Sequence, residues 1–239
     1  MLEIRALHAA YGRSAALHGV SLSVAPGEVV CLIGRNGVGK TSTLRAVVQE
    51  LIHVTGGAVL LEGENLVGLP PHQVVRRGIG YVPEDRRVFA SLTVAENLRV
   101  PVSATRGAAA HWTIEAVYGL FPQLREYRGR VAGVMSGGEQ QMLSIARSLL
   151  TNPRLLLLDE PHEGLAPKVV DEIIAALLRL KREGVAMLIS EQSVRTIKAC
   201  ADRVYVIDRG VTVFDGTPAD FDADPDIARR YLMVSDQGG

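Results

Sequence analysis

The sequence contains few cysteines and no excess charge of either sign. Cys31 and Cys200 are its only cysteines, and Cys31 falls in an apolar run typical of a buried strand. We therefore expect two reduced, buried thiols rather than a disulfide. Lysine plus arginine and aspartate plus glutamate each number 26, so the formal net charge is zero and no basic tract indicates nucleic-acid binding. Nucleic acid is not an expected partner.

Long hydrophobic runs are also missing. No apolar run approaches the roughly 18 residues of a membrane span, and the first residues, 1–5, lack the basic and then apolar pattern of a signal peptide. We therefore expect a cytosolic chain. Its 239 residues are 47% apolar, which is enough for one large core, so we expect a single domain over 1–239.

Apolar patterns predict strands near both ends of the chain and helices in its middle. The predicted strands cover residues 2–7, 20–24, 29–33, 58–62, 80–82, 155–159, 185–190, 204–207 and 211–214. The predicted helices cover residues 42–48, 71–78, a segment capped by Thr93, 136–150, 168–183, 194–201 and 225–231. Strands alternate with helices after residue 151, which indicates a parallel sheet. Residues 86–151 are predicted to form an inserted helical lobe.

The segment Gly34-Arg35-Asn36-Gly37-Val38-Gly39-Lys40-Thr41 is a phosphate-binding loop. It follows the predicted strand at 29–33 and opens the helix that starts with Ser42. The glycines let backbone N–H groups converge on a phosphate at the positive end of that helix. Lys40 would bridge the β- and γ-phosphates, and the Thr41 hydroxyl would coordinate Mg²⁺. A turn that only joins a strand to a helix would leave Lys40 and Thr41 unexplained.

Two adjacent acids follow a predicted buried strand at 155–159. The carboxyl ends of parallel strands are where open α/β sheets bind ligands. Asp159 would hold Mg²⁺, through its water shell, and Glu160 would orient or deprotonate the water that attacks the γ-phosphate. The alternative for these acids is a solvated loop after a strand.

A second phosphate-binding segment is predicted at Ser136-Gly137-Gly138-Glu139, where a long helix begins. A side-chain cap and two glycines would leave free amides and a hydroxyl facing outward at a positive helix end. The chain already has one phosphate loop, so this segment would serve the nucleotide of a facing subunit. The alternative is an ordinary helix cap.

These three motifs, in the order in which they follow one another along the chain, resemble those of the ATP-binding subunits of ABC transporters, and the resemblance covers nearly the whole chain. It identifies 34–41 as the Walker A loop, 155–159 as the Walker B strand and 136–140 as the signature motif. It implies an α/β fold, a P-loop NTPase with a RecA-like core, an N-terminal antiparallel β lobe and the inserted helical lobe. Residues 1–85 and 152–239 would form the nucleotide-binding core, with ATP and Mg²⁺ as cofactors. Tyr11 matches the aromatic residue on which adenine stacks.

Four departures from the commonest family pattern indicate which branch of the family the chain resembles. Glu84 stands where Gln is usual and would be linked to Mg²⁺, and Gln192 replaces the switch His and would contact the γ-phosphate or the attacking water. Ala166 replaces an Asp, and Met135 replaces a Leu. Together these are similar to the second ATPase subunit of branched-chain amino-acid importers. Segments 34–40 and 69–72 also resemble the related urea and short-amide importers.

The resemblance implies an energy-coupling ATPase at the cytoplasmic face of the inner membrane. Two such subunits would sandwich two ATP molecules, and the partner could be a second copy or, as the resemblance favours, a different ATP-binding subunit. Residues 84–98, especially Val88, Phe89 and Leu92, would receive a short helix of the integral-membrane permease; the alternative for these apolar residues is core packing. A periplasmic solute-binding protein would be an indirect partner.

Two other functions compete with this hypothesis. A regulatory subunit that binds ATP but hardly hydrolyses it is suggested by Glu84 and Gln192, although Glu160 is intact. A soluble ABC protein of translation or DNA repair is disfavoured by the single cassette and by the absence of basic tracts and of a coiled-coil insertion.

Overall fold

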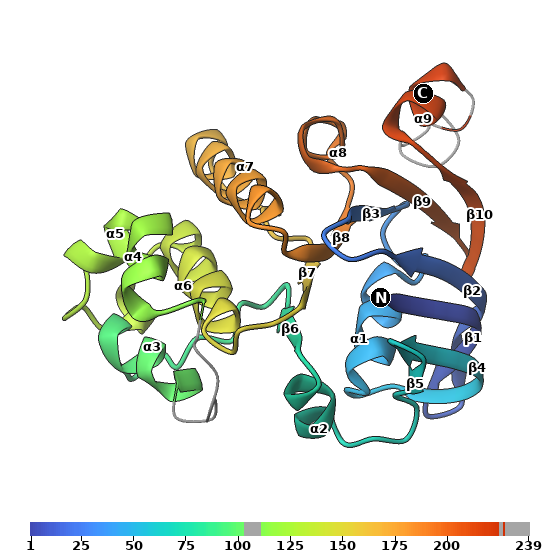
Figure 1. The fold of residues 1–239 in the computed structure, drawn as a ribbon, viewed down its shortest axis with the longest axis horizontal. Coiled ribbons are helices and arrows are strands. Elements are labelled where there is room, and N and C mark those ends of the chain that lie inside the picture. The colour runs from blue at the N-terminus through green and yellow to red at the C-terminus, as the bar shows by residue number, and fades with distance from the viewer. Residues whose placement is uncertain (103–110, 225–226, 228–239) are drawn as a thin grey trace, which may run out of the picture.

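The chain is built around two β-sheets, of which the smaller is antiparallel (Figure 1). A computed structural model describes residues 1–102, 111–224 and 227. Within these residues the smaller sheet has four strands in the order β2-β1-β4-β5. They are β1 (Leu2–Tyr11), β2 (Ser14–Val24), β4 (His53–Leu61) and β5 (Glu64–Asn65). This sheet forms a β lobe on the right of Figure 1.

The larger sheet lies at the centre of the molecule and is mostly parallel. Across the described residues it has six strands in the order β10-β9-β3-β8-β7-β6, of which only β10 runs antiparallel to its neighbour. They are β3 (Val29–Ile33), β6 (Ile79–Val82), β7 (Leu155–Asp159), β8 (Ala186–Glu191), β9 (Arg203–Asp208) and β10 (Val211–Gly216). The predicted parallel sheet is confirmed.

Both faces of this sheet are covered. In β3, Val29, Cys31 and Ile33 face one hydrophobic cluster, whereas Val30 and Leu32 face the other. The first cluster includes the helices of the middle of the chain, and the second includes α1 and the β lobe. A parallel strand covered on both sides needs a continuous apolar sequence rather than an alternating one, which is what β3 and β7 show.

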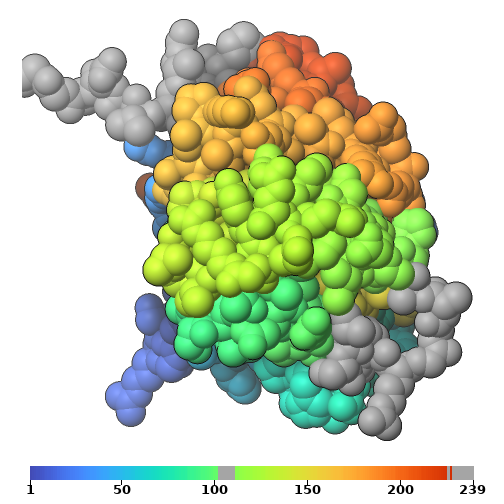
Figure 2. Space-filling model, turned by 90° about the vertical axis from the view of Figure 1, so that its left-hand side faces the viewer, coloured from blue at the N-terminus to red at the C-terminus, as the bar shows by residue number. Residues whose placement is uncertain are grey.

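Helices surround the central sheet on both sides. In chain order they are α1 (Lys40–Val48), α2 (Pro71–Arg76), α3 (Val94–Val102), α4 (Ile114–Leu120), α5 (Pro122–Glu126), the 3₁₀ helix η1 (Ala132–Val134), α6 (Gly137–Leu149), α7 (Pro167–Arg182), α8 (Val194–Cys200) and α9 (Pro218–Ala223). Helices α3 to α6 gather on the left of Figure 1, away from the β lobe. Figure 2 shows them as one continuous face with α7 beside them. No helix of the described ranges is long and apolar enough to cross a membrane.

The parallel strands bring three loops to one edge of the sheet. Strand β3 ends next to the end of β8, where Ile33 pairs with Glu191. Strand β7 ends beside the same strand, where Asp159 pairs with Ser190. The loops that follow Ile33, Asp159 and Glu191 therefore start within a few ångströms of one another, as expected for a ligand site at the carboxyl ends of the strands.

The predicted elements agree with the structure in most places, although β2 and β4 begin earlier than predicted, at Ser14 and His53. Thr93 and Ser136 cap their helices as predicted. Strand β1 extends to Tyr11 rather than Leu7, because a bulge at Ala6, with φ of +42°, interrupts the alternation from which its end was predicted. Helix α9 was not predicted, although Thr217 and Asp220 form a capping box at its start. The helix predicted at 225–231 falls mainly outside the described residues.

Candidate nucleotide-binding site

The phosphate loop connects β3 to α1 through a backbone that needs glycine at two points. A Cβ atom at Gly34, where φ is +153°, would lie 2.4 Å from the carbonyl oxygen of Ile207. Gly39 adopts φ of +117° directly before α1, which has no side-chain cap and no acidic residue in its first turn. The first N–H groups of α1 are thus left for a ligand, and nothing negative on the helix itself opposes an anion there.

Lys40 lies at the base of the loop, with 4% of its surface exposed. Its Nζ donates hydrogen bonds to the carbonyl oxygens of Gly34, at 2.8 Å, and Arg35, at 3.1 Å. The same ammonium lies 3.0 Å from Glu160 Oε1. Backbone carbonyl groups of the phosphate loop therefore hold Lys40 in place, and in this conformation Glu160 balances its positive charge.

Asp159, at the end of β7, is fully buried and surrounded by hydroxyl groups. Thr41 and Ser190 donate hydrogen bonds to its Oδ1, at 3.0 and 2.7 Å, and Tyr81 donates to its Oδ2 at 3.3 Å. Burial raises the pKa of Asp159 above its ordinary value, while the hydrogen bonds from Ser190 and Thr41 oppose that shift. The structure thus brings Thr41 and Asp159, both predicted metal ligands, into direct contact.

Glu160 stands where the loops after β7 and β8 meet the phosphate loop. Its φ of +43° is one that few residues other than glycine adopt, and its N–H donates to Ser190 Oγ at 2.8 Å. The Gln192 amide nitrogen donates to Glu160 Oε2 at 2.9 Å and to Asn36 Oδ1 at 2.6 Å. Burial opposes ionisation of Glu160, but hydrogen bonds and the charge of Lys40 outweigh it and lower the pKa below its ordinary value. Glu160 is thus held as a carboxylate.

A third acid, Glu163, faces Glu160 across the same space. The hydrogen bond between the two carboxyl groups is the largest cause that raises the pKa of Glu163 to about 7; burial and the charges of Glu160 and Glu84 add to it. Of the two acids, Glu163 is therefore the one that carries a proton more readily, while Glu160 stays ionised.

Lys40, Glu160 and Glu163 line a polar cavity of about 260 Å³, and the buried Asp159 lies behind Thr41 at its edge. Its lining residues are Asn36, Gly37, Gly39, Lys40, Thr41, Ser42, Glu84, Glu160 and Glu163. The donors fit a triphosphate at Lys40 and the α1 N-terminus. The oxygen atoms of Thr41 and Asp159 fit Mg²⁺, which binds proteins through one or two carboxylates and takes its other ligands from phosphate and water. No group of three or more His, Cys, Asp or Glu side chains in the described residues could hold a metal ion by itself.

The signature segment lies at the start of α6 and does not line this cavity. The prediction that its amides are free is wrong for two of them, because Ser136 and Glu139 form a capping box. Ser136 Oγ accepts from the Glu139 N–H at 3.3 Å, and the Glu139 carboxylate accepts from the Ser136 N–H at 2.7 Å. Gly138 is buried against α7, where a Cβ atom would lie 2.6 Å from Val169 Cγ1, while Gly137 is half-buried.

Tyr11 lies at the end of β1, outside the residues that line the cavity. Its ring packs against the core of the β lobe, and Arg45 of α1 donates to its hydroxyl at 3.5 Å. Its contact with adenine remains a prediction.

Ser190, Tyr81 and Glu163 contribute to the site but were given no role in the sequence analysis. Each contacts an acid that the motifs had identified, and Ser190 bonds to both Asp159 and the Glu160 N–H. Glu163 carried a signal, since it follows Glu160 by three residues in a tight turn. The pairing of β7 with β8 that places Ser190 here has no local sequence signal.

Comparisons with known proteins agree with this geometry. The family described as ABC transporter matches residues 17–163. The chain is 43% identical to BraG, the high-affinity branched-chain amino acid transport ATP-binding protein of Pseudomonas aeruginosa, over 97% of this chain and 99% of BraG. It is 33% identical to LptB, the lipopolysaccharide export system ATP-binding protein of Escherichia coli, over 97% of this chain and 96% of LptB.

A solved structure described as the ATP-binding subunit of an ABC transporter superposes with a TM-score of 0.82 at 27% identity, covering 95% of this chain and 94% of that one. The predicted ABC ATPase fold is therefore confirmed. With its fold, its phosphate loop and its paired acids, the chain belongs to the ABC transporter family as one of the family's ATP-hydrolysing subunits.

Proposed function

We propose that this chain energises an importer of branched-chain or related amino acids. The observation that carries the proposal is the 43% identity with BraG along almost the whole of both chains, against 33% with the export protein LptB. Glu84 and Gln192, which distinguish the importer branch in sequence, both lie around the phosphate loop: Glu84 lines the cavity and Gln192 bonds to Asn36.

Nucleotide binding begins with an exchange of partners at Lys40. In the present conformation its ammonium contacts Glu160 and two backbone carbonyl groups. A triphosphate that enters between the loop and Glu160 replaces this carboxylate as the counter-charge, and the uncapped N-terminus of α1 receives the phosphate oxygens. Asn36, Gly37 and Ser42 complete the lining. Tyr11 is proposed to stack on the adenine.

Thr41, Asp159 and Glu84 are the residues that would hold Mg²⁺. When bound, the ion would neutralise charge on the β- and γ-phosphates. Thr41 Oγ1 already lies 3.0 Å from Asp159 Oδ1. Glu84 lies on the same cavity, from the loop after β6.

Hydrolysis requires a base, and Glu160 is the carboxylate available. Once Lys40 pairs with phosphate, Glu160 Oε1 is free to orient water and accept its proton. The Gln192 amide, which donates to Glu160 Oε2, then fixes the direction of that carboxylate or contacts the γ-phosphate itself. Glu163 would take up part of the proton, since the pKa of this group lies near neutral pH.

The signature segment is proposed to act on the nucleotide of a facing ATP-binding subunit. It stands on α6, outside the cavity of its own chain. Two subunits arranged head to tail would close each nucleotide between a phosphate loop and Ser136, Gly137, Gly138 and Glu139 of the other. The partner is proposed to be a different ATP-binding subunit.

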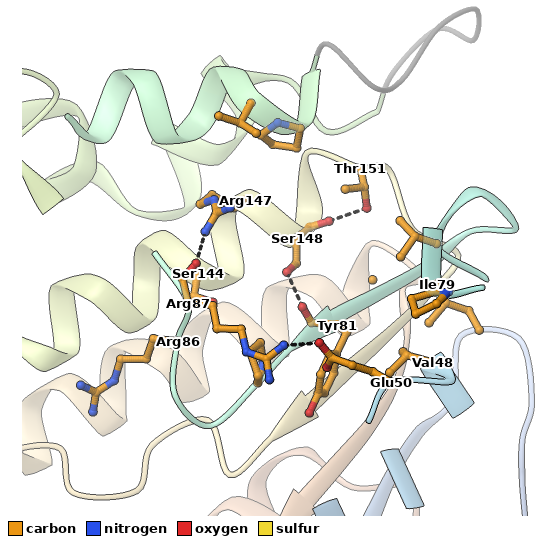
Figure 3. A pocket seen from close by; sticks show the side chains of 16 residues that line it. Val48, Glu50, Ile79, Tyr81, Arg86, Arg87, Ser144, Arg147, Ser148 and Thr151 are labelled. Atoms are coloured by element: carbon orange, nitrogen blue, oxygen red, sulfur yellow. Dashed lines mark hydrogen bonds and ion pairs between the residues drawn. The ribbon is translucent and has the colours of Figure 1, made fainter. Parts of the chain in front are cut away.

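The permease is proposed to dock in a groove of about 300 Å³. It separates α2 and β6 from α3 and α6, and Val75, Tyr81 and Val100 are among its lining residues (Figure 3). Two contacts connect its lining residues. The Ser148 hydroxyl donates to the Tyr81 carbonyl oxygen at 2.9 Å, and Arg87 forms an ion pair with Glu50. We propose that a short cytosolic helix of the permease lies here, which would hold the chain at the cytoplasmic face of the inner membrane.

The predicted docking residues differ in exposure. Phe89 is 44% exposed beside the groove, with the Arg147 guanidinium 4.4 Å from its ring centroid, whereas Val88 and Leu92 are half-buried and Val88 packs against the core. Phe89 is therefore the better candidate for a partner contact, and core packing accounts for Val88.

An uptake experiment tests the proposed function. Cells that carry the gene with its natural neighbours, including any periplasmic solute-binding protein, are compared before and after Glu160→Gln is introduced. We expect the variant to abolish uptake of labelled leucine, isoleucine or valine and to leave uptake of an unrelated sugar unchanged. Loss of urea uptake alone would assign the chain to a urea importer, and undiminished uptake of every solute would contradict the proposal.

A further inference from the structure

A buried polar cluster lies behind the hydrolytic site and lines no part of its cavity. His162, 9% exposed, is paired through Nε2 with Oε1 of Glu191, 3% exposed. The Thr196 hydroxyl, fully buried in α8, lies 3.0 Å from the same nitrogen. Among the described residues, Glu191 Oε1 and His162 Nδ1 are buried without a hydrogen-bond partner, so the ion pair with His162 Nε2 is the contact that compensates the Glu191 oxygen.

The other oxygen of Glu191 organises the loop that carries Gln192. Glu191 Oε2 accepts the backbone N–H of Gln192 at 2.7 Å and that of Ser193 at 2.6 Å. These bonds set the direction in which the Gln192 side chain leaves the backbone. Gln192 in turn donates to Glu160.

His162 belongs to the turn that carries Glu160. The Glu163 N–H donates to the Glu160 carbonyl oxygen at 3.2 Å, and the Leu165 N–H donates to the His162 carbonyl oxygen at 3.3 Å. A displacement of the His162 backbone would therefore move Glu160 with it. Two side-chain pairs therefore connect the loops that supply Glu160 and Gln192. Gln192 bonds to Glu160 beside the cavity, and His162 pairs with Glu191 away from the cavity.

We propose that His162 and Glu191 are positioning residues for ATP hydrolysis: their buried pair fixes Gln192 and Glu160 at the separation that turnover requires. This inference rests on the proposed function. The pair needs only the proton on Nε2, which the neutral Nε2–H tautomer and the imidazolium both carry. Because neither side chain reaches the nucleotide cavity, their loss should slow the chemical step more than it weakens ATP binding.

Substitutions at His162 separate this role from simple packing. His162→Gln keeps an N–H donor near the place of Nε2, whereas His162→Asn has a shorter side chain that does not reach Glu191. We expect His162→Asn to lower kcat about tenfold in the assembled transporter, with KM for ATP changed less than about twofold, and His162→Gln to recover most of the turnover. His111→Asn is the matched control, because it removes an exposed pair with Glu183 at 3.0 Å, far from the site.

Glu191→Gln and a combined variant keep the test decisive if His162→Asn folds poorly. Glu191→Gln should lower kcat to a similar extent, and Gln192→Ala should cost less in the Glu191→Gln background than in the parent, since both act on one contact. The inference fails if these variants turn over like His111→Asn, if kcat and ATP affinity fall equally, or if the Gln192 effects add independently. An assembled transporter that hydrolyses no ATP with the parent chain, or that still does with Lys40→Ala, would instead contradict the proposed function.

Discussion

The two helix starts expected to bind phosphate are built in opposite ways. Helix α1 begins without a side-chain cap or an acidic residue in its first turn, and Lys40 lies buried beside it. Helix α6 begins with a complete capping box in which Ser136 and Glu139 satisfy each other, and Arg130 lies 3.7 Å from Glu139. The N–H groups at the start of α1 are therefore open to an anion. At the start of α6 the Glu139 carboxylate already accepts a hydrogen bond from a backbone N–H group.

This difference supports the proposal that one chain needs a facing subunit to complete its site. The α1 site can hold nucleotide with residues of its own chain, because every group around the cavity comes from loops at one sheet edge. The α6 start does not line this cavity, and under the proposed function it acts on a nucleotide held by a facing subunit.

The largest effect is expected from Lys40→Ala. The triphosphate would lose its principal counter-charge inside a buried site, so ATP binding or hydrolysis should be abolished. Binding of ATP to the purified chain and turnover of the transporter are the measurements. Lys198→Ala is the control, since it removes an exposed lysine paired with Asp222. Undiminished turnover in Lys40→Ala would remove the phosphate-loop assignment.

Glu160→Gln should separate binding from turnover. The amide keeps the shape but cannot act as a base, so hydrolysis should fall by about 10²-fold or more. ATP should still bind and persist, because Lys40 also loses the carboxylate with which ATP competes. Retention of labelled ATP and the size of the complex measure this outcome. Hydrolysis near the parental rate would show that another group is the base.

Gln192→Ala should slow turnover on the order of 10²-fold while ATP still binds, because it removes one preorganised donor next to Glu160. Gln192→His should retain activity but acquire a dependence between about pH 6 and 7, where imidazole titrates and an amide does not. The rate profile of the assembled transporter from pH 5.5 to 8.5 is the measurement. If Gln192→Ala turns over like the parent, the bond to Glu160 has no part in hydrolysis.

The smallest effect is expected at Glu84, an exposed residue on the rim of the cavity. A carboxylate binds Mg²⁺ more strongly than an amide, so Glu84→Gln should raise the Mg²⁺ concentration needed for half-maximal turnover several-fold. Titration of Mg²⁺ at saturating ATP measures the shift. An unchanged requirement would place Glu84 against solvent or the permease instead.

The parts of this site that were predictable from sequence are those with a local cause. A strand, a glycine loop and a helix follow one another in 29–48, and the acids Asp159 and Glu160 end an apolar strand. Each pattern determines its own geometry within a few residues. Prediction at this level succeeded because local sequence and tertiary fold agree there.

The remaining features depend on contacts between distant segments. Gln192 meets Glu160 only because β8 lies beside β7, and strand order has no local signal in the sequence. The buried pair of His162 with Glu191 has the same origin. At the start of α6 the prediction of free amides was wrong for a local reason. Ser136 and Glu139 form a capping box, as their spacing predicts, and this box uses two of the amides that were expected to be free.

The central claim is that the α1 site binds nucleotide alone and that the α6 start acts only on a partner's nucleotide. The most direct test measures ATP affinity of the isolated chain and turnover of the assembled transporter for Lys40→Ala and Ser136→Arg, with Ser136→Ala as the control for the lost cap. We predict that Lys40→Ala loses both, whereas Ser136→Arg keeps the parental ATP affinity in isolation and loses turnover in the assembly. A Ser136→Arg chain that binds ATP as poorly as Lys40→Ala would contradict the account.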